Sequence, residues 1–217
     1  WQVPYDSTIR LSDPFELVGP PLPADEAGLA EVAKVCEVLN RLGARVNDSC
    51  GFHVHVDGAD LNLTQMKNLF KLFAKFESCL DQLVSPSRRD YGCDFARSVR
   101  HAFGPGGSLQ NVFRAIDGLR NIEHFSDRVS RYSKLNPHAL LRHGTVEIRM
   151  HNGTVSARKM LPWIALCVGM VDRAAATRSV KAEPPNFARM ARWAGSRSRL
   201  IHSRRAMLQR NAAAAVA

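Results

Sequence analysis

The sequence lacks a long uninterrupted apolar run. Its longest one, Met160 to Val171, contains a proline and is much shorter than the roughly 20 residues that cross a bilayer. We interpret this run as a buried helix and expect no membrane partner. The chain also opens without the charged-then-apolar pattern of a secretion leader, which favours a cytoplasmic location.

Cysteine is sparse, and so are aromatic residues. The five cysteines are an odd number, are scattered and include no CxxC pair, which argues against a disulfide framework and a zinc knuckle. We expect reduced thiols. With 45% apolar, 23% charged and 7% aromatic residues, the 217-residue chain has the composition of one ordinary globular domain, with room for an appendage.

Acidic residues are scarce near the C-terminus. From Arg173 onward there are ten basic residues and one acidic residue, so this segment carries +9 of the net charge of +10. A nucleic-acid-binding fold would more often spread its basic residues over the whole domain. We therefore interpret 1–175 as the catalytic domain and 176–217 as a basic Arg/Ala-rich tail, the one part expected to contact nucleic acid.

The periodicity of apolar residues predicts strands and helices of uneven length, with residues 128–141 ambiguous. The expected strands are 1–3, 15–18, 51–57 and 144–151. The expected helices are 25–42, 64–83, 108–119 and 156–176. Thr64 is the predicted N-cap of its helix, and residues 85–107 are predicted to form a long loop. The absence of a regular βαβ rhythm favours an α+β fold.

The first chemical signal is the stretch Cys-Gly-Phe-His-Val-His-Val-Asp at residues 50–57. Side chains alternate faces along a strand, so His53, His55 and Asp57 share one face and the two valines share the other. Imidazoles two positions apart lie about 7 Å from each other. One of them can bind a metal while the other reaches a neighbouring group such as a phosphate.

The second signal is Gly-Thr-Val-Glu-Ile-Arg-Met-His at residues 144–151. The same alternation places Glu147, Arg149 and His151 on one face. A carboxylate and a guanidinium on one face can act as a metal ligand and as a clamp for phosphate or carboxylate. A solvent-facing sheet surface is the alternative, but paired His and paired Glu/Arg in both strands favour a functional site.

Four blocks in this order resemble the amidoligase family, the ATP-dependent relatives of glutamine synthetase and glutamate–cysteine ligase. They are the N-terminal W…D-S…E-L-V segment, the HxH strand, Arg-Tyr-Ser-Lys-Leu-Asn and Gly-Thr-Val-Glu-Ile-Arg-Met-His-Asn-Gly-Thr, at 1–22, 50–57, 131–136 and 144–154. The resemblance spans about residues 1–175. It implies an antiparallel sheet of the glutamine synthetase type, with helices packed on one face and a polar active-site face opposite.

The resemblance also implies a metal site. His53 and Glu147 would be ligands of Mg²⁺ or Mn²⁺, and Glu16 would be a third ligand; its alternative is a surface residue of an edge strand. The family's opening Gly-x-Glu-x-Glu strand, which supplies two further carboxylates, has no counterpart in these 217 residues. The domain is therefore expected to lack its first strand and some of its metal ligands.

The remaining implied roles concern anions. His55 would contact the nucleotide or its phosphates, and Arg149 would hold the phosphoryl group or the substrate carboxylate. Arg131 would contact phosphate, unless it is a solvated helix charge. The implied reaction joins a carboxylate to an amine, at the expense of ATP and through an acyl phosphate, because a free carboxylate is a poor electrophile.

Other interpretations remain open. The HxH strand alone would also suit a metal-dependent hydrolase, the basic tail a nucleic-acid-binding protein, and the whole chain an inactive ligase fragment. Cys50 is either a nucleophile or a small buried residue, and His151 either supports the site or lies on the surface. Phe70, Phe73 and Phe76 are predicted to be core residues.

Overall fold

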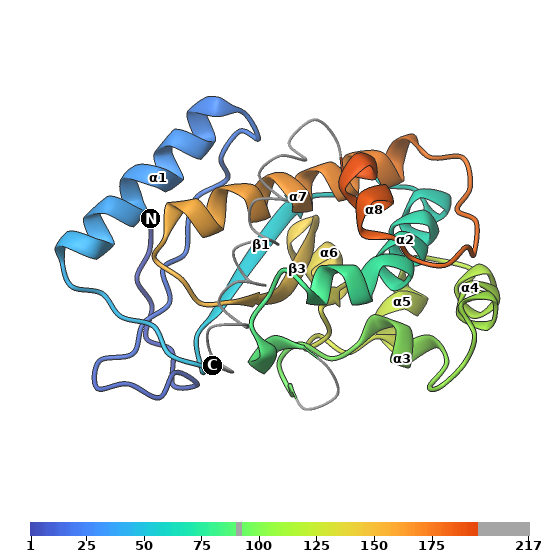
Figure 1. Cartoon of the computed structure of the whole chain (residues 1–217), viewed down its shortest axis with the longest axis horizontal. Helices are drawn as coiled ribbons and strands as arrows, with labels where there is room; N and C mark the ends of the chain where they lie inside the picture. Colours follow the sequence, from blue (N-terminus) through green and yellow to red (C-terminus); the bar gives the residue numbers. More distant parts are fainter. Residues whose placement is uncertain (90–92, 195–217) are drawn as a thin grey trace.

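The computed structural model describes residues 1–89 and 93–194, which form a small sheet surrounded by helices (Figure 1). The elements follow the order α1 (Glu26–Arg41), β1 (Gly51–Asp57), α2 (Leu63–Asp81), the 3-10 helix η1 (Pro86–Arg88), α3 (Val99–Phe103), α4 (Leu109–Asp117), α5 (Glu123–Arg128), β2 (Leu135–Asn136), α6 (His138–His143), β3 (Thr145–Asn152), α7 (Ala157–Ala176) and α8 (Phe187–Trp193).

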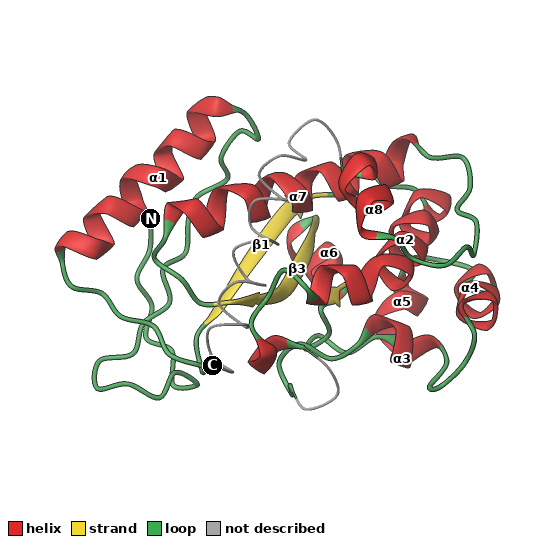
Figure 2. Ribbon diagram, viewed as in Figure 1, coloured by secondary structure: helices red, strands yellow, loops and turns green. Residues whose placement is uncertain are grey.

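The sheet is antiparallel, with its three strands in the order β1–β3–β2. Figure 2 shows the neighbouring strands β1 and β3 in yellow. Helices combined with an antiparallel sheet confirm the predicted α+β class. β1 has the predicted bounds, and β3 begins and ends one residue later than predicted. The ambiguous segment 128–141 supplies β2 and α6, while the predicted loop 85–107 contains η1 and α3. Residues 90–92 of that loop lie outside the described residues.

The core lies between the apolar side of the sheet and helices α2 and α7. Val54 of β1 and Ile148 of β3 belong to it, together with Phe70, Phe73 and Phe76 of α2, all of which are buried. The prediction that these phenylalanines are core residues is confirmed. Burying one such side chain contributes about 1.5–3 kcal/mol, so α2 is a main contributor to the core on the apolar side of the sheet.

The N-cap of helix α2 lies two residues before the predicted one. Its N-cap is Asn62, whose side chain accepts a hydrogen bond from Gln65 N at 3.0 Å, while Gln65 Oε1 accepts from Asn62 N at 2.9 Å. This reciprocal capping box satisfies two amides that have no partner inside the helix. Thr64, the predicted cap, instead lies within the first turn.

Helix α8 packs against α7 through a close approach of their backbones. A Cβ at Gly169 would lie 2.2 Å from the carbonyl oxygen of Ala194, so only glycine fits there. Phe187 and Met190 of α8 are buried in the core. Part of the predicted tail therefore packs on the domain, the boundary after residue 175 stays a prediction, and 195–217 lie outside the described residues.

The N-terminal segment runs beside the sheet without joining it. The strands predicted at 1–3 and 15–18 are present only as two isolated bridges, Gln2–Val18 and Tyr5–Phe15. Pro4 and Pro14 adjoin these bridges and cannot donate to a ladder, so longer strands do not form. The prediction of two regular strands is wrong in extent.

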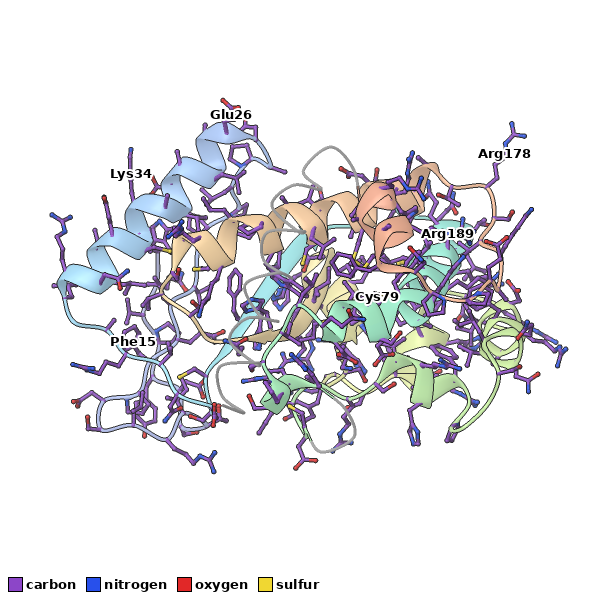
Figure 3. All side chains as sticks on the ribbon, in the orientation of Figure 1. Phe15, Glu26, Lys34, Cys79, Arg178 and Arg189 are labelled. Atoms are coloured by element: carbon purple, nitrogen blue, oxygen red, sulfur yellow. The ribbon has the colours of Figure 1, made fainter. Side chains whose placement is uncertain are left out.

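The labelled side chains in Figure 3 place this segment at one end of the molecule, with Phe15 far from Arg178 at the other end.

Across the two described ranges, the helices are all too short or too polar to span a bilayer.

Candidate active site

The two strands that carry the ionisable residues lie next to each other. In the antiparallel register of β1 and β3, His55 lies directly opposite Glu147, and Asp57 lies opposite Thr145. Directly paired residues share a face of the sheet. The polar faces predicted separately for each strand therefore form one surface.

The ladder between β1 and β3 contains a bulge. Between the pairs Phe52–His151 and Val54–Ile148, β3 has one residue more than β1. The extra residue turns His151 towards the core, where it is fully buried and its ring centroid lies 5.0 Å from that of Trp163. The expectation that His151 shares the site face is wrong, because simple alternation does not include the extra residue.

Glu147 is at the centre of the polar face. Its Oε1 accepts a hydrogen bond from Arg149 Nη1 at 2.6 Å, and its Oε2 accepts from Asn136 Nδ2 at 2.6 Å. His53 Nδ1 and His55 Nε2 lie 3.4 and 3.8 Å from Oε1. Burial alone would raise the pKa of this carboxyl, but Arg149 and the Asn136 hydrogen bond outweigh it and hold the pKa below its usual value. Glu147 is therefore an anion at neutral pH.

His53 lies at the bulge, with its two ring nitrogens in different surroundings. Nδ1 faces the carboxylates of Glu147 and Glu16, 3.9 Å from the latter. On the other side, a Cβ at Gly51 would lie 2.7 Å from Nε2, so glycine makes room for the ring. Burial, helped by the charge of Arg149, lowers the pKa of His53 to about 4. The imidazole is neutral at pH 7 and has one nitrogen lone pair free to act as a ligand.

Glu16 reaches the site from the N-terminal segment. Its backbone amide donates to Pro4 O at 3.0 Å, which joins the two arms of that segment, while its side chain is half exposed. Burial raises the pKa of Glu16, and the negative charges of Asp6 and Glu147 raise it further. The structure thus brings the three predicted metal ligands together, with two acids on the same side of one imidazole.

His55 is more exposed than His53. Its Nδ1 lies 2.9 Å from the hydroxyl of Thr145, and its pKa is lowered, chiefly by burial. The hydrogen bond fixes the orientation of the ring and directs Nε2 towards Glu147. A ring held in this way at the open edge of the site can contact a ligand through Nε2.

Arg149 and Arg131 share one aromatic ring. Their guanidinium carbons lie 5.8 and 5.0 Å from the ring centroid of Tyr132, distances typical of cation–π contacts. Arg149 also has a buried Nε with no hydrogen-bond partner. The structure therefore brings Arg131, an exposed residue, to the edge of the site through Tyr132.

Three residues of the site are not among the predicted site residues, although Arg88 begins a segment, 88–93, that resembles a family segment closing over substrate or else a solvated loop. Asn136 lies opposite Glu147 on β2, Tyr132 precedes that strand, and Arg88 ends η1. Asn136 and Tyr132 stand in the block 131–136 that resembles the family, which is a usable signal. Nothing in the sequence pairs Arg88 with β1.

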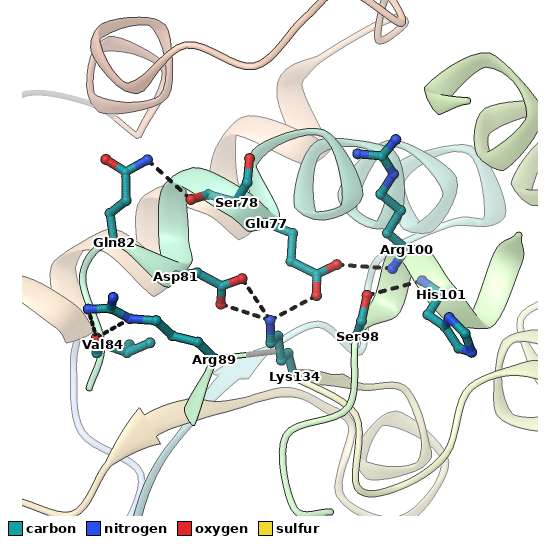
Figure 4. A network of polar contacts seen from close by, with 10 residues as sticks. All are labelled: Glu77, Ser78, Asp81, Gln82, Val84, Arg89, Ser98, Arg100, His101 and Lys134. Carbon is teal, nitrogen blue, oxygen red and sulfur yellow. Dashed lines mark hydrogen bonds and ion pairs between the residues drawn. The ribbon is translucent and has the colours of Figure 1, made fainter. Parts of the chain in front are cut away.

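A buried ion network holds this part of the site in place (Figure 4). Lys134 Nζ lies 3.0 Å from Glu77 and 2.7 Å from Asp81 of α2. Its backbone carbonyl accepts from Arg149 N at 2.9 Å. The network therefore ties β2, which carries Asn136 opposite Glu147, to helix α2.

Cys50 is a packing residue. It is buried, and a Cβ at Gly153 would lie 2.4 Å from its Cβ. Its carbonyl accepts hydrogen bonds from Gly153 N at 2.7 Å and from Arg88 Nη2 at 2.7 Å. These contacts match the interpretation of a small buried residue at a crowded turn. All five cysteines are free, as predicted.

The donor set fits a hard divalent cation in kind, since it combines two carboxylates with one neutral imidazole. Over the described ranges, however, no group of three or more His, Cys, Asp or Glu residues is arranged to hold a metal ion. Glu147 is engaged instead by Arg149 and Asn136. A cation at this position would therefore have to share Glu147 with, or take it from, Arg149.

Comparison with known proteins agrees with the geometry. The chain matches no curated protein sequence and no solved structure. Residues 4–171 match the family model described as "putative amidoligase enzyme", a span that contains both strands, Glu16 and the block 131–136. The chain belongs to this amidoligase family.

Proposed function

We propose that the protein is an ATP-dependent ligase that joins a carboxylate to an amine through an acyl phosphate. The observation that carries the proposal is the cluster around Glu147, where one buried carboxylate meets a guanidinium at 2.6 Å and a neutral imidazole at 3.4 Å. Membership of an amidoligase family supports a ligase. The three antiparallel strands would then form part of a sheet of the glutamine synthetase type.

In the first step, an oxygen of the substrate carboxylate attacks the γ-phosphorus of ATP, and the bond to the ADP oxygen breaks. Negative charge spreads over the phosphoryl oxygens, and preorganised cations stabilise it. Arg149 is placed to hold the phosphoryl group or the carboxylate, while His55 and the exposed Arg131 can contact the nucleotide phosphates. Held by Tyr132, both guanidiniums need little reorganisation.

In the second step, the amine attacks the acyl carbon, phosphate leaves with the bonding electron pair, and the nitrogen loses its proton. The site must exclude water, which would hydrolyse the acyl phosphate. Arg149 balances the charge of the departing phosphate by the same contacts. The amine and acid remain defined by class, as small molecules, peptides or a protein side chain.

A divalent cation completes the proposal. His53 Nδ1, Glu147 and Glu16 would hold Mg²⁺ or Mn²⁺, which neutralises the phosphate oxygens when bound. The low pKa of His53 and the ionised state of Glu147 keep both donors in their ligating form at pH 7.

The test is ADP release measured with Mg²⁺, ATP, and panels of carboxylates and amines. Wild type should release ADP only when both an acid and an amine are present. Glu147→Gln should lower this rate at least a hundredfold, because it removes the charge that meets Arg149 and His53. Glu123→Gln, on the exposed start of α5, is the matched control and should leave the rate unchanged.

A hydrolase is the second candidate, because both histidines of the HxH strand lie within 4 Å of Glu147. Phosphate release from ATP or an ester that is indifferent to acid and amine would support it and contradict the ligase.

A further inference from the structure

Arg88 is a buried cation that the proposed reaction does not yet use. It ends η1 and is 3% exposed. One guanidinium nitrogen, Nη2, donates to Cys50 O at 2.7 Å, and the buried Nε has no hydrogen-bond partner. Arginine is almost never fully buried unless it is paired, because burying an unpaired charge is costly. The incompletely hydrogen-bonded guanidinium of Arg88 is therefore a candidate group for binding a ligand.

No carboxylate of the described residues forms an ion pair with Arg88. Within residues 1–89 and 93–194, Arg149 and Arg189 form ion pairs with acids at 2.6 and 2.9 Å, but Arg88 forms none. Its hydrogen bond goes to a neutral carbonyl, and the negative charge of Asp48 acts on it without forming an ion pair. Arg88 therefore brings a positive charge without an ion-pair partner to the base of the site.

The geometry directs that charge to the reaction face. A Cβ at Gly51 would lie 2.7 Å from His53 Nε2 and 3.5 Å from Arg88 Nη2, so the two side chains meet over this glycine. Burial lowers the pKa of Arg88, and the positive charge of Arg149 acts in the same direction. The side chains of His53 and Arg149 are 23% and 13% exposed. These two side chains are therefore partly accessible to solvent, whereas Arg88 is buried.

The guanidiniums of Arg88 and Arg149 are both incompletely hydrogen-bonded. Each has a buried Nε without a partner, and the one ion pair that the two form with a described acid is that of Arg149 with Glu147. A guanidinium binds oxyanions through fixed, paired donors. An added group with two negative charges would satisfy both arginines, whereas a monoanionic carboxylate would satisfy one.

We propose that Arg88 and Arg149 form an oxyanion subsite beside His53 that binds a phosphoryl group. This assignment rests on the proposed function, in which the group is the one transferred from ATP to the substrate acid. Arg88 supplies the second positive charge, and Gly51 leaves the space in which Arg88 and His53 approach the group together.

The test uses inorganic phosphate as the probe, in metal-free and nucleotide-free buffer at constant ionic strength. Calorimetric titration should give at least a tenfold larger Kd for Arg88→Gln than for wild type, because a charge-assisted contact is lost. Arg88→Lys keeps the charge and should lie between them. Arg89→Gln is the control, because the guanidinium of Arg89 bonds to Val84 O instead. Circular dichroism establishes that each variant is folded.

Each outcome bears on one proposal. Equal Kd values for wild type, Arg88→Gln and Arg89→Gln, or no phosphate binding by wild type, would overturn the subsite even if the wild type makes amides. Acetate binding as tightly as phosphate would overturn the phosphoryl assignment. Loss of phosphate binding in Arg88→Gln, in a protein whose ADP release ignores acid and amine, would support the subsite and refute the ligase.

Discussion

Two buried charge clusters flank one backbone hydrogen bond, that from Arg149 N to Lys134 O. In the first, the ammonium of Lys134 lies between the carboxylates of Glu77 and Asp81, within hydrogen-bond distance of both (Figure 4). Burial alone would lower the pKa of Lys134, but the two acids outweigh it and raise the pKa. The single ammonium is the ion-pair partner of both carboxylates, and Glu77 also accepts a hydrogen bond from Arg100 N at 3.0 Å.

In the second cluster the guanidiniums are incompletely paired. Arg149 forms an ion pair with the buried carboxylate of Glu147, Arg88 forms none with a described acid, and each retains a buried Nε without a hydrogen-bond partner. Satisfied charges hold a fold in place, whereas unsatisfied ones are a cost that a ligand can relieve. The difference teaches that burial of charge alone does not identify a site; an incompletely paired guanidinium does.

Lys134→Met is expected to change the free energy of unfolding the most. Removing the ammonium leaves two buried carboxylates facing each other, so the free energy of unfolding should fall by about 3–5 kcal/mol. Urea unfolding followed by circular dichroism measures it. Lys67→Met, which removes one contact to the Asp117 carbonyl, should cost no more than about 1 kcal/mol. Similar losses in both variants would show that the Lys134 cluster has no special role in stability.

A smaller effect is expected from acid. The pKa of His53 is lowered to about 4 in the folded state, against about 6.5 in the unfolded chain. The unfolded chain therefore binds the proton first, and stability falls by up to about 1.4 kcal/mol per pH unit as the pH drops from 6.5 towards 4. Unfolding in EDTA-containing buffers measures the slope.

His53→Asn should flatten that slope, while His101→Asn, at an exposed position of α3, should not. Parallel slopes for wild type and His53→Asn would contradict the burial of a neutral imidazole at this position.

The smallest effect is expected for Arg88→Met. The substitution removes the hydrogen bond from Arg88 to Cys50 O, but this oxygen still accepts one from Gly153 N at 2.7 Å. No described acid loses an ion-pair partner. Stability should therefore change by less than about 1 kcal/mol, in either direction. Urea unfolding beside Lys134→Met makes the comparison direct. A loss of 3 kcal/mol or more would show that Arg88 serves the fold as Lys134 does.

The sequence predicted the strands better than their surroundings. Alternation gave β1 and β3 almost to the residue, and with them the shared face of His53, His55 and Glu147, because each strand has apolar residues on one side only. It misplaced His151, because a bulge is a property of the pair of strands and not of either one.

Long-range contacts were beyond the sequence. Asn136 lies beside Glu147 because a two-residue strand pairs with β3, and Arg88 reaches Cys50 because the chain turns after α2. Neither contact has a periodic signal. The predicted cap at Thr64 failed for a local reason, since Asn62 and Gln65 satisfy each other's amides.

The additional residue of β3 changes the alternation of that strand after Ile148. Up to Ile148, the even-numbered Val146 and Ile148 belong to the hydrophobic core. Beyond Arg149, Met150 belongs to the core and its neighbour His151 is fully buried as well. The bulged strand therefore encloses two consecutive side chains, one of which a regular strand would leave on the polar face.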